Sequence, residues 1–139
     1  MKTAVVYWSG TGNTEAMAGS VAEGAKSAGA EVSVFTAADF SADMVDQFDS
    51  IAFGCPSMGS EQLEDSEFEP MFNACEAKLS GKKVGLFGSY GWGDGEWMRN
   101  WEEQCIADAV MAGEGVICNE APDDTATEQC VALGKALAS

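Results

Sequence analysis

Val5-Val6-Tyr7-Trp8-Ser9-Gly10-Thr11-Gly12-Asn13-Thr14 carries the clearest structural signal in this chain. The segment begins with the apolar run of a buried strand and ends in glycine and hydroxyl residues. The following residues, 15–28, place apolar side chains at helical spacing. A loop between a strand and a helix start presents backbone N–H groups, and the helix dipole favours negative charge there. The segment therefore predicts an anion-binding loop with donors from Ser9, Gly10, Thr11, Gly12, Asn13 and Thr14.

Residue types that the loop does not contain narrow down the kind of anion that it could bind. Gly12 is not followed by Lys and Ser/Thr, which excludes the loop that binds nucleoside triphosphates. Glu15 stands where a dinucleotide fingerprint would have its third glycine. Because residues 9–14 include no Lys or Arg, we expect neutral donors to hold a phosphate monoester.

Length and composition indicate a single domain over residues 1–139 with a substantial core. The 46% hydrophobic content excludes a disordered chain. The sequence contains no run of about 18 apolar residues, so no membrane-spanning helix is predicted. Met1-Lys2-Thr3 leads directly into the first strand, so we expect no signal peptide. The five cysteines form no CxxC pair, and we expect them to be small buried residues of a cytoplasmic protein.

The net charge of −16, from 7 basic and 23 acidic residues, excludes several kinds of partner. Such a chain repels nucleic acids and anionic membranes. It favours basic partner proteins, with transient docking whose rate depends on salt, and we expect a monomer. The absence of histidine excludes every catalytic scheme that needs imidazole, and no metal site is predicted.

Strand and helix patterns alternate along the chain. Strands are predicted at 3–8, 31–35, 50–54 and 83–88, and a fifth strand within 109–118 on both sides of an interruption at 113–115. Helices are predicted at 15–28, 41–48, 66–79, 96–107 and 125–137, with capping boxes at Ser66/Glu69 and Thr125/Glu128. This order predicts an α/β fold: a three-layer, doubly wound, five-stranded parallel sheet with helices on both faces.

Three glycine-containing loops follow the first, third and fourth predicted strands. They span residues 9–14, 57–61 and 89–94. Because ligands of such sheets bind beyond the carboxyl ends of the strands, these loops should meet at one edge and form one site.

Three motifs in this order resemble the flavodoxin family, specifically its short-chain, clostridial-type members. They are residues 7–15, residues 58–61 and the segment 81–95, with Asn119-Glu120 and Pro122-Asp123 fitting the last loop. The resemblance covers essentially the whole chain. It implies strand order 2-1-3-4-5, one tightly but non-covalently bound FMN, and one-electron transfer between redox enzymes in place of ferredoxin, without substrate turnover.

The resemblance also assigns roles around the flavin. Met58 would cover the inner face of the ring and Trp92 the outer face. The helical spacing of Trp97 and Trp101, and the position of Trp8 at a strand end, instead predict packing residues. A flip of the Gly59–Ser60 peptide would present a carbonyl to the flavin N5–H after reduction by one electron and one proton, and Glu61 would accept from N3–H. The remaining predicted cofactor residues are Pro56, Ser57, Ser89, Tyr90, Gly91, Gly93 and Asn119.

Other functions of related folds fit the sequence less well. A low-molecular-weight phosphatase needs Cys-x5-Arg, but the sixth residue after Cys55 is Glu61. A receiver domain needs paired acids near the end of the first strand, where Tyr7-Trp8-Ser9 stands. The alternative that stays open is an FMN-dependent quinone or NAD(P)H oxidoreductase, which oxidation of added NADH would reveal.

Overall fold

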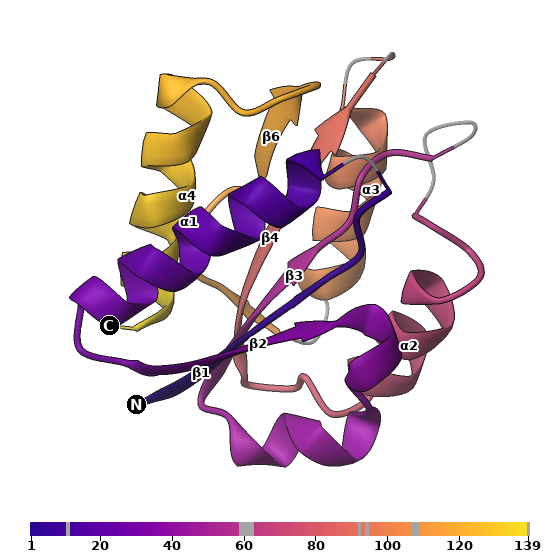
Figure 1. Cartoon of the computed structure of the whole chain (residues 1–139). Helices are drawn as coiled ribbons and strands as arrows, with labels where there is room; N and C mark the ends of the chain where they lie inside the picture. The colour runs from indigo at the N-terminus through magenta and orange to yellow at the C-terminus, as the bar shows by residue number, and fades with distance from the viewer. Residues whose placement is uncertain (11, 59–62, 92, 94, 107–108, 139) are drawn as a thin grey trace.

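A parallel sheet forms the middle layer of the computed structural model, which describes residues 1–10, 12–58, 63–91, 93, 95–106 and 109–138 (Figure 1). Its strand order is β2-β1-β3-β4-β5, with β6 also paired to β4, so the predicted order is confirmed. Every pairing is parallel, as the alternation of strands and helices requires. The strands are β1 (Lys2–Tyr7), β2 (Glu31–Thr36), β3 (Ser50–Gly54), β4 (Lys83–Tyr90), β5 (Val110–Met111) and β6 (Val116–Asn119).

Helices cover both faces of this sheet, as Figure 1 shows. One face packs on α1 (Asn13–Ser27) and α4 (Asp124–Leu137). The other packs on α2 (Phe68–Glu76), α3 (Glu96–Ile106) and two 3-10 helices, η1 (Ala37–Asp39) and η2 (Ala42–Gln47). The helix predicted at 41–48 is therefore present, but as the tighter 3-10 form. Within the described residues, no helix has both the length and the apolar character needed to cross a bilayer.

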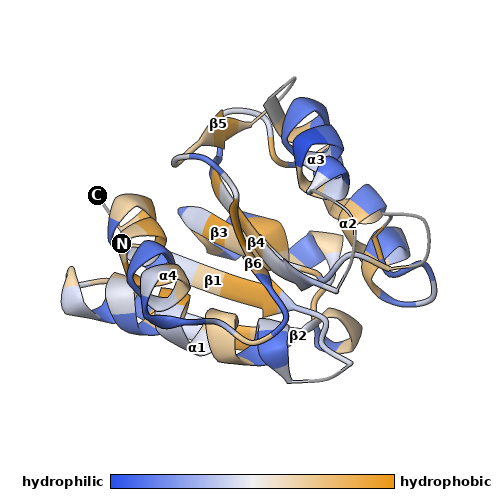
Figure 2. Cartoon of the chain, turned by 90° about the horizontal axis from the view of Figure 1, so that it is seen from above, coloured by the Kyte–Doolittle hydropathy of each residue, from blue (hydrophilic) through white to orange (hydrophobic). Residues whose placement is uncertain are grey.

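The central strands are hydrophobic on both faces because helices cover both. In β3, Ile51 and Phe53 belong to the core under α2 and α3, while Ala52 belongs to the core under α1 and α4. Viewed from above in Figure 2, β1, β3 and β4 form a hydrophobic layer with hydrophilic segments on the flanking helices. Trp97 and Trp101 are each 2% exposed, so their prediction as packing residues is confirmed.

The fifth strand position is divided into two pieces, as the interruption at 113–115 predicts. β5 pairs with Lys83 and Val84 at the start of β4, and β6 pairs with residues 87–90 at its end. Between the pieces, the backbone N–H of Gly115 donates to the Glu102 carboxylate of α3 at 2.8 Å. This bond fixes the connecting loop against the neighbouring helix and allows β6 to reach the carboxyl edge of the sheet.

The two predicted capping boxes are wrong, because other carboxylates cap the helices. At α2, the carboxylate of Glu64 accepts from the backbone N–H groups of Ser66, Glu67 and Phe68 and from the Ser66 hydroxyl. At α4, the Asp123 side chain accepts from the Ala126 N–H at 2.8 Å. A side chain that lies before the helix can reach several N–H groups at once, which Ser66 within the turn cannot.

Glu64→Gln is expected to lower the free energy of unfolding by about 2 kcal/mol at pH 7, since a buried carboxylate with several donors is replaced by a neutral amide. Burial alone would raise the pKa of Glu64, but its four hydrogen bonds lower it from 4.5 to about 2. A lowered pKa adds stability above pH 4.5 that is lost as the pH falls toward 2. Urea unfolding of both proteins at pH 7 and pH 3 measures this. If the difference in unfolding free energy between the native protein and Glu64→Gln did not become smaller at pH 3, the role of the Glu64 carboxylate as the helix cap would be contradicted.

Candidate functional site

Residues of three loops meet beyond the carboxyl ends of the strands and line an open cavity of about 660 Å³, called the large cavity below. The loops follow β1, β3 and β4, and the segment after β6 completes the wall. This convergence confirms that the three predicted loops share one edge of the sheet. The lining residues are Trp8, Gly10, Asn13, Pro56, Ser57, Met58, Ser89, Tyr90, Gly91, Glu120 and Ala121.

The loop after β1 has the geometry of an anion-binding turn. Gly12 has a φ of 93° in the left-handed region, which glycine adopts at little cost, and α1 begins at the next residue. The Ser9 hydroxyl oxygen accepts from the backbone N–H of Gly12 at 3.0 Å and of Glu15 at 3.3 Å. Ser9 therefore folds the loop back onto the first turn of α1. The positive end of the α1 dipole lies at this loop.

Ser89 joins the three loops to one another. Its hydroxyl lies 3.3 Å from that of Thr14, and its backbone N–H donates to the Thr14 hydroxyl oxygen at 3.4 Å. Its carbonyl accepts from the Ser57 N–H at 3.0 Å. Thr14 and Ser89 are buried, so their hydroxyls hold the loops together from beneath the cavity. Preorganisation of this kind reduces the entropy that a ligand must remove when it binds.

The segment after β6 also lines the large cavity, with Glu120 and Ala121. The Tyr90 carbonyl accepts from the Glu120 N–H at 2.8 Å and from the Asn119 amide at 3.3 Å. Glu120 has a φ of 58°, and among the described residues no other non-glycine residue has a positive φ. A non-glycine residue in this region is uncommon, and such strain gathers at functional sites.

Most of the described site residues line a cavity or support the loops around it. Gly10, Asn13, Pro56, Ser57, Met58, Ser89, Tyr90 and Gly91 line the large cavity. Ser9 and Gly12 line an adjoining cavity of about 450 Å³, called the side cavity. Thr14 and Asn119 make hydrogen bonds that support the loops. Gly93 lines neither cavity and has a φ of 88°. Predictions for Thr11, Gly59, Ser60, Glu61 and Trp92 lie outside the described residues.

The predicted cofactor residues leave out three residues of the cavity wall, namely Trp8, Glu120 and Ala121, although Trp8 and Glu120 lie within the motifs that carry the resemblance. The position of Trp8 at the end of a strand predicts a packing residue, yet Trp8 is half-buried and lines both cavities. The signal that could have revealed it is its position directly before the glycine loop. Glu120 and Ala121 follow the last strand, and the end of that strand is hard to predict across an interrupted segment.

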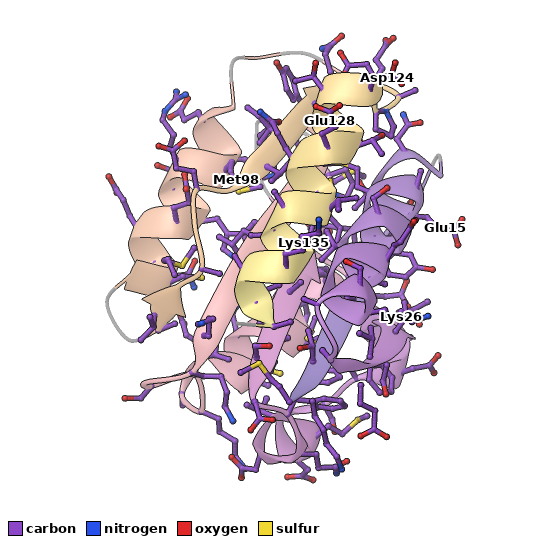
Figure 3. All side chains as sticks on the ribbon, turned by 90° about the vertical axis from the view of Figure 1, so that its left-hand side faces the viewer. Glu15, Lys26, Met98, Asp124, Glu128 and Lys135 are labelled. Atoms are coloured by element: carbon purple, nitrogen blue, oxygen red, sulfur yellow. The ribbon has the colours of Figure 1, made fainter. Side chains whose placement is uncertain are left out.

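Charge is distributed unevenly between the two ends of the sheet. Figure 3 shows the pattern on two helices: Glu15 and Lys26 lie at opposite ends of α1, and Asp124 and Lys135 toward opposite ends of α4. The other lysines also lie at the end away from the cavity, next to the starts of strands or the end of α2: Lys2, Lys78, Lys82 and Lys83. The cavity end carries acids of four segments: Glu15, Glu67, Glu120, Asp123 and Asp124.

None of the five cysteines lines the large cavity or the side cavity. All five are free and buried, as predicted. Burial raises the pKa of Cys55 and of Cys130 to about 12, so these thiols are protonated at neutral pH. A protonated, buried thiol is a poor nucleophile, and Cys55 serves instead as an acceptor for the Glu64 N–H at 3.3 Å.

Comparisons with known proteins agree with this geometry. The flavodoxin family model matches residues 5–134. The chain is 50% identical to a flavodoxin of Megasphaera elsdenii over 96% of both chains, and 45% identical to one of Clostridium beijerinckii over 97% of this chain and 98% of that protein. The solution structure of two-electron reduced Megasphaera elsdenii flavodoxin superposes with a TM-score of 0.91 and covers 98% of each chain. The chain therefore belongs to the flavodoxin family, whose members carry electrons on bound FMN.

Proposed function

We propose that the large cavity holds the FMN and that the loop at residues 9–14 holds its phosphate. The observation that supports this placement most directly is the convergence of three loops on one cavity next to the start of α1. A volume of about 660 Å³ lies within the range of small-molecule sites. Neutral donors and a helix dipole suit a phosphate that stays bound, because they compensate its charge without attracting other anions strongly.

The donor set of the cavity fits the rest of the cofactor. Asn13 and Ser57 offer polar groups along the wall for a ribityl chain, while Met58 and Tyr90 offer apolar surface for a flat ring. Met58 is 38% exposed, so its side chain is accessible to a ligand in the cavity. Met58, Gly59, Ser60, Glu61 and Trp92 keep the roles that the sequence predicts for them, as part of this proposal.

Bound FMN supplies the one-electron redox chemistry. The chain orients the cofactor, shields part of it from water and surrounds it with negative charge. The acids at the cavity end oppose any gain of negative charge inside the cavity, since like charges raise each other's energy in a partly dry site. This arrangement favours an electron donor of low potential.

We further propose that basic redox proteins dock transiently at the acidic cavity end, and that the chain acts as a cytoplasmic monomer. The net charge of −16 and the lysines at the far end of the sheet give the molecule a charge asymmetry that orients an approaching cation. The five free thiols fit a reducing compartment.

Raising the salt from 10 mM to 500 mM is expected to slow electron transfer to a basic protein acceptor by about tenfold, because salt screens the attraction. Stopped-flow reduction of cytochrome c by the reduced holoprotein measures the rate. Ferricyanide is the matched control, since it is an anion and its reduction should become faster with salt. A rate with cytochrome c that does not change with salt would contradict electrostatic docking.

One experiment separates a carrier from an enzyme. The holoprotein, reduced photochemically under nitrogen, should pass electrons to cytochrome c, and the oxidised holoprotein should not oxidise NADH or NADPH. Steady oxidation of either nicotinamide in the presence of a quinone would overturn the proposal in favour of an oxidoreductase.

A further inference from the structure

Two consecutive aromatic residues at the end of β1 each donate a hydrogen bond to a carboxylate. The Tyr7 hydroxyl donates to Glu15 at 2.9 Å, and the Trp8 indole N–H donates to Glu67 at 3.2 Å. The two side chains leave the sheet on opposite faces: Tyr7 packs against the core under α1 and α4, and Trp8 against the core under α2 and α3. The chain is therefore held on both sides directly before the glycine loop begins.

Trp8 also supports this loop by contact. A Cβ added at Gly10 would lie 3.1 and 3.3 Å from the Cη2 and Cζ3 atoms of the indole, so the ring lies directly beside the Gly10 backbone. The same ring lines both the large cavity and the side cavity. Since Glu67 directly precedes α2, its bond to Trp8 connects the loop after β1 to the segment that leads from β3 into α2.

Simple electrostatics does not explain why these acids stand here. Glu15 and Glu67 both line the side cavity, next to a loop that binds an anion. Their charges repel a phosphate, so each should weaken its binding if charge were their main effect. Each instead binds an aromatic donor that lies at the entrance to the loop. That pattern points to a geometric function that outweighs the repulsion.

We propose that Trp8 and Glu67 are positioning residues whose hydrogen bond holds the loop at residues 9–14 in its phosphate-binding shape. The proposal rests on the proposed placement of the FMN phosphate in that loop. The bond acts before the ligand arrives, and it favours ligands that carry the phosphate over ligands that lack it.

The test is titration of apoprotein with FMN and with riboflavin, which lacks the phosphate. Glu67→Leu and Trp8→Phe both remove the hydrogen bond, and each is expected to weaken FMN binding about three- to tenfold, the loss that a single hydrogen bond corresponds to. Glu67→Gln keeps an oxygen that accepts from the indole and removes the charge, so it should bind FMN at least as tightly as the native chain. Riboflavin affinity should stay within about twofold for both Glu67 variants, because Glu67 lines the side cavity and not the large cavity.

Asp65→Leu is the matched control. Asp65 is an exposed acid two residues away in the same segment, so this variant removes the same charge without touching the indole. It should leave FMN binding unchanged or slightly tighter. The unfolding midpoint of each apoprotein shows whether it is folded.

Three other outcomes would each overturn a different part of the proposal. If Glu67→Leu binds FMN as tightly as the native chain or more tightly, the hydrogen bond to Trp8 does not support phosphate binding and the proposal is wrong. Equal losses for FMN and riboflavin in Glu67→Leu would show a general structural role and would also overturn the proposal. A native apoprotein that binds FMN no better than riboflavin would refute the placement of the phosphate itself, which is a different failure.

Discussion

Native apoprotein is expected to bind FMN at least about a hundredfold more tightly than riboflavin. The loop at residues 9–14 lies at the start of α1, where backbone N–H groups and the helix dipole favour an anion. Hydrogen bonds to a charged group are worth roughly 1.5–3 kcal/mol each, so two of them suffice for this ratio. Quenching of flavin fluorescence during titration gives both dissociation constants under the same conditions.

The variant Ser9→Ala tests whether the loop at residues 9–14 causes the preference for FMN over riboflavin. The Ser9 hydroxyl oxygen accepts two backbone N–H groups that fold the loop onto α1, so its loss should weaken FMN binding and leave riboflavin binding unchanged. Similar affinities of the native apoprotein for the two flavins would mean that the phosphate lies outside this loop.

Gly24→Ala is expected to lower the free energy of unfolding by at least about 3 kcal/mol, at the upper end of the range for overpacking. At Gly24 of α1, a Cβ would overlap the backbone carbonyl of Val131 in α4, and at Gly134 of α4 it would overlap that of Val21 in α1. The two helices therefore touch backbone to backbone at both glycines. Backbone atoms cannot move aside as a flexible side chain can, so α1 and α4 would have to separate. Urea unfolding of the apoprotein measures the loss.

Gly19→Ala provides the control with the opposite sign. Gly19 also lies within α1, but it is exposed and a Cβ there would meet nothing within 4 Å. Replacing glycine by alanine at such a position should stabilise the helix by about 0.5–1 kcal/mol. If both variants changed stability in the same direction, the close contact between α1 and α4 would be wrong.

The sheet and the position of the site could be predicted because they depend on local patterns. Apolar strands such as 50–54 are buried on both faces, and a glycine loop after a strand has few structural alternatives. Once the elements alternate, the rules for parallel sheets bring the three loops to one edge. Even the interruption at 113–115 carried a usable signal, since glycines on both sides of Glu114 disfavour a continuous strand.

Helix caps and the wall of the cavity could not be predicted in this way. The cap of α2 comes from Glu64, four residues before the helix begins, and only the folded loop brings its carboxylate to the N–H groups of Glu67 and Phe68. No local pattern distinguishes such an acid from an exposed one. The left-handed conformation of Glu120 is equally hidden, because nothing in a glutamate favours it.

Trp8 shows why a residue type alone does not reveal its function. A tryptophan at the end of a strand is usually a packing residue, and Trp8 does pack against the core. Its indole N–H needs a partner, however, and the partner lies 59 positions away in sequence. Only the three-dimensional structure shows that this partner is Glu67, which lines the side cavity together with Ser9 and Gly10.

The most direct measurement is the identity and amount of the pigment in the purified protein. The protein is denatured in acid, and the released small molecules are separated and quantified against authentic FMN, FAD and riboflavin. We expect one FMN for each chain, and we expect the resulting apoprotein to regain its visible spectrum with one equivalent of FMN. Protein that releases no flavin, together with apoprotein that does not take up added FMN, would contradict the account.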